Sequence, residues 1–261
     1  MIAAESTPTR TDQAASIWTV SAPAWAENWA AHTWRRGPLP GFLAGFKNDQ
    51  EFNDASIPIS RDIFTPETLR RYTEVREKLS QGEAIFDPDA LCHPAGIPAQ
   101  VAAVVNVFRV MFSRDRIVML FNNSLTYRTI YMDGRDLPKN PEPTYMGYSV
   151  GHWEGDTLVV HSNGMRSDNT QLEPGLPHSD EFRMTERWRP ITGDEIEVTL
   201  TYEDPLVFKH PVDVVVHYIK TTEDQLREVF CTDNNRYTIS PTSGSLTLMG
   251  PNGQPLPLAE D

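Results

Sequence analysis

The sequence YMGYSVGHWEGDTLVVHS, which runs from Tyr145 to Ser162, holds two runs that are rich in β-branched and aromatic residues. Residues of these types favour β-strands. Between the two runs lies Glu154-Gly155-Asp156, a combination that is typical of tight turns. We therefore predict a β-hairpin with strands at residues 145–153 and 157–162.

The same pattern repeats on both sides of this hairpin. Further runs of this kind lie at residues 104–112, 116–122, 126–133, 182–188, 196–202, 212–220 and 226–232. Short turns separate the runs, so the strands follow one another as an antiparallel meander. A meander of about nine strands must protect its edges, and closure into a barrel does so. We predict a mainly β fold, an antiparallel meander over residues 101–235 that closes into a lipocalin-like barrel around a pocket.

The remaining segments are predicted as additions to this barrel. Residues 1–15 are polar and predict a disordered tail, and residues 236–261 predict a C-terminal tail. Residues 16–100 predict a helical and irregular segment that packs on the barrel. Within it, Thr65 as N-cap, Pro66 in the first turn and Gly82 as a stop predict a helix over 65–82.

Tryptophans gather near the N-terminus. Trp25 and Trp29 are four residues apart, so a helix that begins at Pro23 presents both on one face. This face is expected to pack on the barrel or on a second subunit, which would make the protein a homodimer.

Composition excludes several classes of partner. The chain has 261 residues and a net charge of −13, which disfavours nucleic acid as a partner. No apolar run reaches the roughly 20 residues that span a bilayer, and the N-terminus lacks a secretory signal. We expect a cytoplasmic protein, or a periplasmic one if a signal has been removed. The two cysteines, Cys92 and Cys231, are expected to be unpaired and packed.

One block of sequence resembles a known group of proteins. It comprises Arg128-x-Ile130-Tyr131-Met132-Asp133-Gly134-Arg135, Gly147-x-Ser149-Val150-Gly151-x-Trp153-Glu154-Gly155-Asp156-Thr157-Leu158-Val159-Val160, His178-Ser179, Glu186-Arg187, Asp204-Pro205 and the earlier Cys92-His93-Pro94-x-Gly96-x-Pro98. Over residues 90–215 the chain resembles a large family of poorly characterised bacterial proteins that has no settled common activity. It also loosely resembles lipocalin-like barrels, and this second resemblance implies a ligand cavity.

Strand alternation brings one carboxylate into the predicted interior. Phe182, Met184, Glu186 and Trp188 share a face of their strand, so Glu186 lies among large apolar side chains. Such a carboxylate needs a partner or a raised pKa. Arg128 faces inward by the same rule and is the expected partner. The pair is either part of an active site or a structural strut.

Other candidates depend on the register of the hairpin and on loops. A two-residue turn places His152, His161 and Tyr148 on one surface, whereas a three-residue turn separates the histidines. Tyr131 and Asp133 share a face of their strand. His178-Ser179-Asp180 and Asp204 follow or precede strands in loops, where functional residues are common.

Motifs that would identify a cofactor or a metal are missing from the sequence. It contains no GxGxxG after a strand, no GxxxxGK[ST], no HExxH and no CxxC pair. Gly147-Tyr148-Ser149-Val150-Gly151 has the letters of a nucleophile elbow, but it lies within a predicted strand with no helix after it. We therefore predict neither a cofactor nor a metal.

These features favour a cofactor-independent lyase, dehydratase or isomerase that acts by acid–base chemistry on a hydrophobic, aromatic or terpenoid molecule. Glu186 or His152 would be the base, Tyr131 or His178 the acid, and Arg128 would hold an oxyanion. The predicted substrate-binding residues are Tyr148, His161, Trp153, Phe182, Trp188 and Asp204. The alternatives are a non-catalytic lipocalin-like protein that binds a hydrophobic ligand, and an interaction module that uses the tryptophan-rich segment.

Overall fold

A computed structural model describes residues 22–36, 61–81, 92–102, 107–122, 126–168, 171–173, 176–222, 226, 237–239 and 246–248. The predicted tail at 1–15 lies outside these residues, as does most of the predicted strand at 226–232. Within the part of the chain described, none of the helices combines the length and apolar character of a membrane span.

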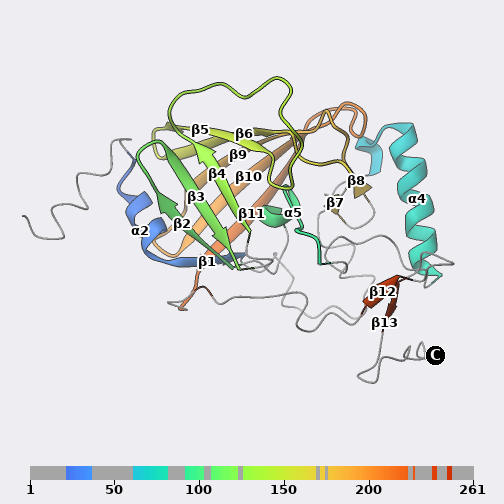
Figure 1. Cartoon of the computed structure of the whole chain (residues 1–261), viewed down its shortest axis with the longest axis horizontal. Helices are drawn as coiled ribbons and strands as arrows, with labels where there is room; N and C mark the ends of the chain where they lie inside the picture. The colour runs from blue at the N-terminus through green and yellow to red at the C-terminus, as the bar shows by residue number, and fades with distance from the viewer. Residues whose placement is uncertain are drawn as a thin grey trace, which may run out of the picture.

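Nine strands form a closed barrel (Figure 1). In chain order they are β1 (Thr33–Arg36), β2 (Val107–Phe112), β3 (Arg116–Phe121), β4 (Tyr127–Tyr131), β5 (Tyr148–Glu154), β6 (Thr157–Asn163), β9 (Arg183–Pro190), β10 (Glu195–Glu203) and β11 (Val212–Lys220). From β2 to β11 each barrel strand pairs with the next one along the chain, and β1 closes the ring between β11 and β2. The predicted mainly β fold and its closure into a barrel are confirmed.

The central hairpin has the register that a two-residue turn requires. Glu154 pairs with Thr157, and His152 pairs with Val159. Gly155 has a φ of 60°, a left-handed conformation that glycine adopts at little cost. The turn therefore decides which residues of β5 and β6 face the interior.

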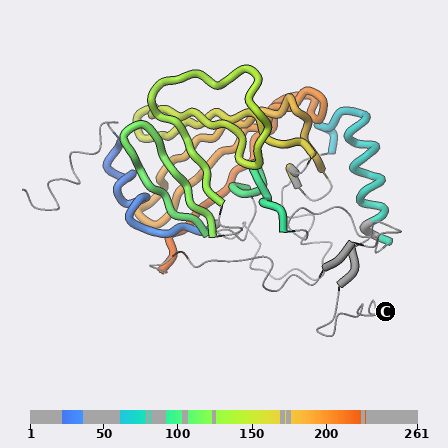
Figure 2. Tube along the Cα trace, viewed as in Figure 1, coloured from blue at the N-terminus to red at the C-terminus, as the bar shows by residue number. Residues whose placement is uncertain are grey.

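One pair of strands departs from the antiparallel pattern. β4 and β5 are parallel and share two residue pairs, Ile130 with Ser149 and Tyr131 with Val150. A parallel pair needs a long crossover, and Figure 2 shows the connection from β4 to β5 as a wide excursion outside the strands. The meander prediction is wrong at this point, because strand patterns do not show the direction of a neighbour.

Large side chains fill the interior of the barrel. The ring of Trp188 stacks on Tyr218 at 5.2 Å between centroids, and Phe108 meets Tyr218 edge-on at 4.9 Å. Helix α2 (Trp25–Ala31) adds Trp29, whose ring lies 5.3 Å from that of Trp188. The tryptophan-rich helix thus packs on the barrel, which is one of the two expected arrangements, the other being contact with a second subunit.

The remaining elements lie around the barrel. Helix α4 (Pro66–Ser80) begins as predicted, with Thr65 Oγ1 accepting a hydrogen bond from the backbone of Thr68 at 3.3 Å. Figure 1 shows α4 on the opposite side of the barrel from α2. The shorter elements are η2 (Arg61–Ile63), α5 (Ala99–Ala102), the pair β7 (Gln171–Glu173) and β8 (Leu176–Pro177), and the pair β12 (Tyr237–Ile239) and β13 (Leu246–Leu248) within the predicted C-terminal tail.

Cys92 is disulfide-bonded, so the expectation that it is unpaired is wrong. The sequence has one other cysteine, Cys231, which lies outside the described residues. Spacing along the chain could not reveal the bond, because it depends on which distant segments the fold brings together.

We expect the Cys92→Ala variant to lose about 2–4 kcal/mol of unfolding free energy, because the cross-link restricts the unfolded chain. Urea denaturation of the variant and of the native protein measures the difference. Peptide mapping should find Cys92 unreactive to iodoacetamide until a reductant is added. Alkylation of Cys92 in the untreated native protein would contradict this.

Candidate functional site

The residues predicted for a site lie in three separate places. One group is inside the barrel, a second is on its outer wall, and a third lines a pocket beside α4. The fold therefore does not assemble the predicted residues into a single site.

The inner group is a network around Arg128 and Glu186. Arg128 Nη1 donates to Glu186 Oε2 at 2.9 Å, and Nη2 donates to Glu186 Oε1. The same guanidinium donates to Ser149 Oγ at 3.1 Å and to Ser162 Oγ at 2.7 Å. Trp188 Nε1 donates to Glu186 Oε2 at 3.0 Å. The pairing of Glu186 with Arg128 is confirmed.

This network is sealed from solvent. Arg128 is 1 % exposed and Glu186 is fully buried, and both carboxylate oxygens accept hydrogen bonds. A general base must reach the proton that it abstracts, and a carboxylate enclosed in this way is not accessible to a substrate. Of the two roles expected for the pair, the arrangement favours the structural one, in which the ion pair joins β4 to β9.

The second group lies on the outer wall. His152 and His161 stack with ring centroids 5.9 Å apart, as the two-residue turn predicts, but their strand positions face away from the interior. His152 Nε2 lies 3.1 Å from Glu154 Oε1, and His161 Nδ1 lies 3.0 Å from Thr185 Oγ1. Burial lowers the pKa of His161, and the neighbouring His152 adds to the effect. Both histidines lie on the opposite face of the sheet from Glu186, since His161 pairs with Thr185, the neighbour of Glu186 on β9.

Two predicted aromatic residues accompany the histidines on the outside. Tyr131 and Tyr148 stack at 5.1 Å, and Arg135 donates from Nη1 to the phenol oxygen of Tyr148 at 3.0 Å. Trp153 instead faces the α2 end of the barrel, where its ring meets that of Trp25 edge-on at 5.6 Å. The predicted acid Tyr131 therefore lies on the opposite face of β4 from Arg128 and the interior network that it was expected to serve.

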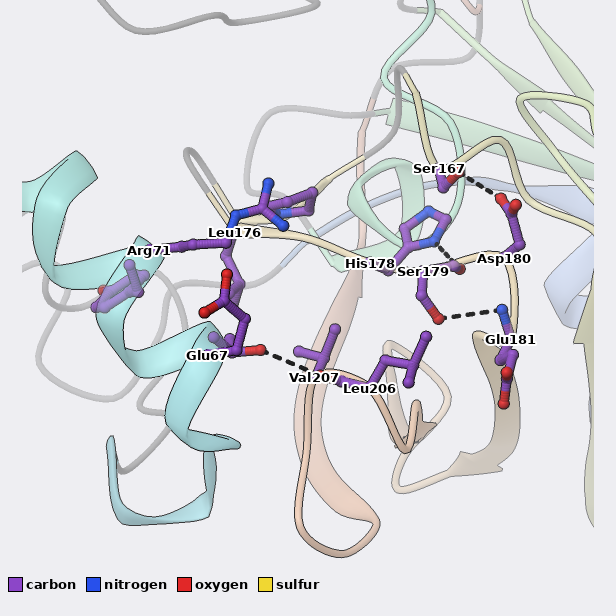
Figure 3. Close-up of a pocket in the computed structure, with 13 residues that line it drawn as sticks. Glu67, Arg71, Ser167, Leu176, His178, Ser179, Asp180, Glu181, Leu206 and Val207 are labelled. Atoms are coloured by element: carbon purple, nitrogen blue, oxygen red, sulfur yellow. Dashed lines mark hydrogen bonds between the residues drawn. The ribbon is translucent and has the colours of Figure 1, made fainter.

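The third group lines a pocket of about 710 Å³ between α4 and the segment that joins β8 to β9 (Figure 3). Its lining comprises Glu67, Thr68, Arg71 and Tyr72 of α4, Ser167, residues 176–181, Leu206 and Val207. In Figure 3, α4 forms one side, His178 and Asp180 lie on the other, and Leu206 and Val207 lie between them.

His178 is the titratable group at the centre of this site. Its side chain is buried, and its ring lies 4.7 Å from that of Phe182. Its Nδ1 is 2.8 Å from the carbonyl oxygen of Ser179, which can only accept, so Nδ1 carries the hydrogen. Nε2 is then the basic nitrogen of the neutral ring. Burial lowers the pKa of His178 below its ordinary value near 6.5, so the ring is neutral at pH 7.

Asp204 fixes the loop that carries His178. Its Oδ2 accepts from the backbone of Ser179 at 2.6 Å, and its Oδ1 accepts from Ser179 Oγ at 2.8 Å. The backbone of Leu206 also donates to Oδ1, at 3.1 Å. Asp204 is buried, so these hydrogen bonds are shielded from water. Its position next to His178 is that of a positioning residue rather than one that contacts a ligand.

Several residues of this pocket were not among the sequence predictions. Ser167, which donates to Asp180 Oδ1, precedes β7, and Glu67, Arg71 and Tyr72 lie on a helix that the sequence connected with no chemistry. The amphipathic pattern of the helix predicts that one of its faces packs against the protein, but it does not indicate which loop that face contacts.

The acidic and histidine side chains of the described residues do not gather into a group of three that could hold a metal ion. Histidines 152, 161 and 178 are instead divided between the outer wall and the pocket.

No family model matches the chain, and no curated protein matches it.

Proposed function

We propose that the protein is an enzyme that works without a cofactor and moves protons on a small molecule bound beside His178. The observation that carries this proposal is a buried imidazole, neutral at pH 7 and held in one tautomer, in the wall of a pocket large enough for a small substrate. A neutral imidazole can accept a proton and return it, which is the chemistry of lyases, dehydratases and isomerases.

The roles follow from the contacts of the loop. His178 Nε2 acts as the base, and the Ser179 carbonyl stabilises the imidazolium that forms, because it accepts from Nδ1. Asp204 holds the backbone of Ser179 in place. The imidazolium returns this proton from Nε2 to another atom of the bound molecule, which restores the neutral ring. Asp180 and Glu181 place carboxyl groups at the pocket wall, where they can hold polar parts of the substrate.

The lining also supports a class of substrate. Leu176, Pro177, Leu206 and Val207 offer an apolar surface, whereas Glu67, Asp180 and Glu181 outnumber Arg71 as the charged groups. The net charge of −13 acts in the same direction. The substrate is therefore a neutral or cationic molecule with a hydrophobic part, in keeping with the hydrophobic small molecule expected from the sequence.

Untargeted mass spectrometry of a metabolite extract incubated with the protein tests the proposal. An isomerase gives a product of unchanged mass, a dehydratase a product lighter by one water, and a lyase two fragments. We expect one of these outcomes.

A non-catalytic carrier of a hydrophobic ligand is the second candidate, because Leu206 is 60 % exposed at the pocket. It predicts a compound that binds unchanged and no turnover. The extract experiment therefore separates the two functions.

The disulfide at Cys92 bears on where the protein works. Disulfides persist in oxidising compartments and are rare in the cytoplasm. Of the two locations considered, the periplasmic one is the better supported, and we propose it. We also propose that the chain is related to the poorly characterised bacterial family that it resembles over residues 90–215.

The pKa of His178 predicts how stability depends on pH. The native state favours the neutral ring, so its pKa is lower than that of the unfolded chain, which is near 6.5. The contribution of His178 to the unfolding free energy is therefore fully present above pH 6.5 and is lost as the pH falls below it. One such group changes the unfolding free energy by at most about 1.4 kcal/mol per pH unit.

Urea denaturation between about pH 7.5 and 5.5 measures this slope. The His178→Gln variant should show a smaller slope than the wild type. It should retain some dependence, since burial also lowers the pKa of His161. Equal slopes in the two proteins would contradict the assignment of His178 as a buried neutral group.

A further inference from the structure

A second pocket, of about 440 Å³, lies on the outer wall where β4 and β5 run parallel. The two strands share only two residue pairs, so no backbone hydrogen bonds of the sheet join them beyond this short stretch. The lining comprises Pro94, Thr126, Tyr127, Thr129, Tyr131, Thr144, Tyr145, Met146, Gly147, Tyr148 and Ser149. It has no residue in common with the pocket beside α4.

Tyrosine dominates this lining. Four of the eight tyrosines in the chain are part of it. Tyr127, Thr129 and Tyr131 alternate along the outer face of β4, so this row is about 13 Å long at the usual rise per residue. Tyr127 is 64 % exposed and therefore offers its ring to a ligand.

The lining contains no charged residue, although 23 % of the chain is charged. Cations do lie next to it. The guanidinium of Arg135 sits 3.9 Å from the centre of the Tyr131 ring, and that of Arg166 sits 5.0 Å from Tyr145. Each of these arginines is neutralised by an aspartate two residues away in sequence, Asp133 and Asp168. The arginines hold the rings in place and leave the pocket without net charge.

This chemistry selects the ligand. Aromatic faces favour flat apolar surfaces, while the phenol and threonine hydroxyls both donate and accept hydrogen bonds. A sugar ring presents both kinds of surface, a face of C–H groups and a rim of hydroxyls, and it carries no charge. An ionic ligand would find no counter-charge in the lining. We propose that this tyrosine pocket, defined by the lining given above, is a binding site for a neutral oligosaccharide.

Isothermal titration calorimetry with cellotriose, maltotriose and triacetylchitotriose tests the proposal. At least one should bind with a Kd on the order of 1 mM or lower. Tyr127→Ala should weaken that binding about tenfold, because it removes the exposed stacking surface. Tyr127→Phe should bind within about threefold of the wild type, since the ring remains. The control is Met111→Ala, which removes an apolar side chain that is 49 % exposed on β2 outside the pocket, and it should leave the binding unchanged.

Three outcomes would overturn the proposal. The first is no heat of binding with any of the three saccharides. The second is binding that Tyr127→Ala leaves unchanged while its circular dichroism matches the wild type. The third is binding of a proline-rich peptide, lost in Tyr127→Ala, with no saccharide bound, which would assign the pocket to peptides. None of these outcomes depends on His178, so the proposal stands apart from the enzymatic one.

Discussion

The Glu186→Gln variant should unfold with about 3–5 kcal/mol less free energy than the native protein. Glutamine keeps the shape of glutamate but removes the charge that balances Arg128. The guanidinium, 1 % exposed, would then be buried without a counter-charge, which is costly. Urea denaturation followed by circular dichroism measures the loss.

A matched control comes from the next strand of the same sheet. Glu197 on β10 is paired with Arg189 on β9 at 2.6 Å on the outer face, where Arg189 is exposed and Glu197 is partly exposed. Glu197→Gln should change the unfolding free energy by no more than about 1 kcal/mol. Replacing both inner partners, as Glu186→Leu with Arg128→Met, should recover part of the loss, because no charge remains unpaired.

A different result would restore Glu186 as a catalytic base. That result is a Glu186→Gln protein of unchanged stability whose turnover falls by about 10²- to 10⁴-fold. Stability and turnover measured on one preparation therefore separate the strut from the base.

The His178→Gln variant should lose about 10²- to 10⁴-fold in kcat/KM for the compound that the extract experiment identifies. Glutamine has a similar size and still donates a hydrogen bond, but it cannot take up a proton. The loss should be in kcat rather than in KM, because glutamine keeps the approximate size of the side chain and the rest of the pocket lining is unchanged. The rate of the native enzyme should fall at acidic pH, as protonation removes the base, whereas the residual rate of the variant should not.

His217→Gln is the control for this variant. His217 lies on β11 with Nδ1 2.8 Å from Glu195 Oε1, and it lines none of the pockets described above. The His217→Gln variant should retain wild-type turnover. A His178→Gln protein with full activity would contradict the proposed mechanism.

Much of the barrel could be predicted because each strand has its own local signal. The hairpin is an example: the turn at Gly155 fixes the register, and the register places His152 and His161 together. The Glu186–Arg128 pair followed from period-two alternation and the cost of an unpaired buried charge.

The parts that failed depend on contacts between distant segments. β1 is four residues long and holds two arginines, so nothing in Thr33–Arg36 marks it as the strand that closes the barrel. Alternation tells which residues share a face, but the outer face of a barrel can be as well packed as the inner one. This is why His152 and Tyr131 were expected at a site and lie instead on the outer wall. The pocket beside α4 required knowing where that helix docks.

The central claim is that a ligand binds beside α4, against His178, and not inside the barrel. A crystallographic fragment screen tests it most directly, because it requires no known substrate. We predict that amphipathic amine fragments occupy the pocket with a polar atom within hydrogen-bond distance of His178 and an apolar part against Leu206. Fragments that enter the barrel and displace the contacts of Arg128 with Glu186, with none beside His178, would contradict the account.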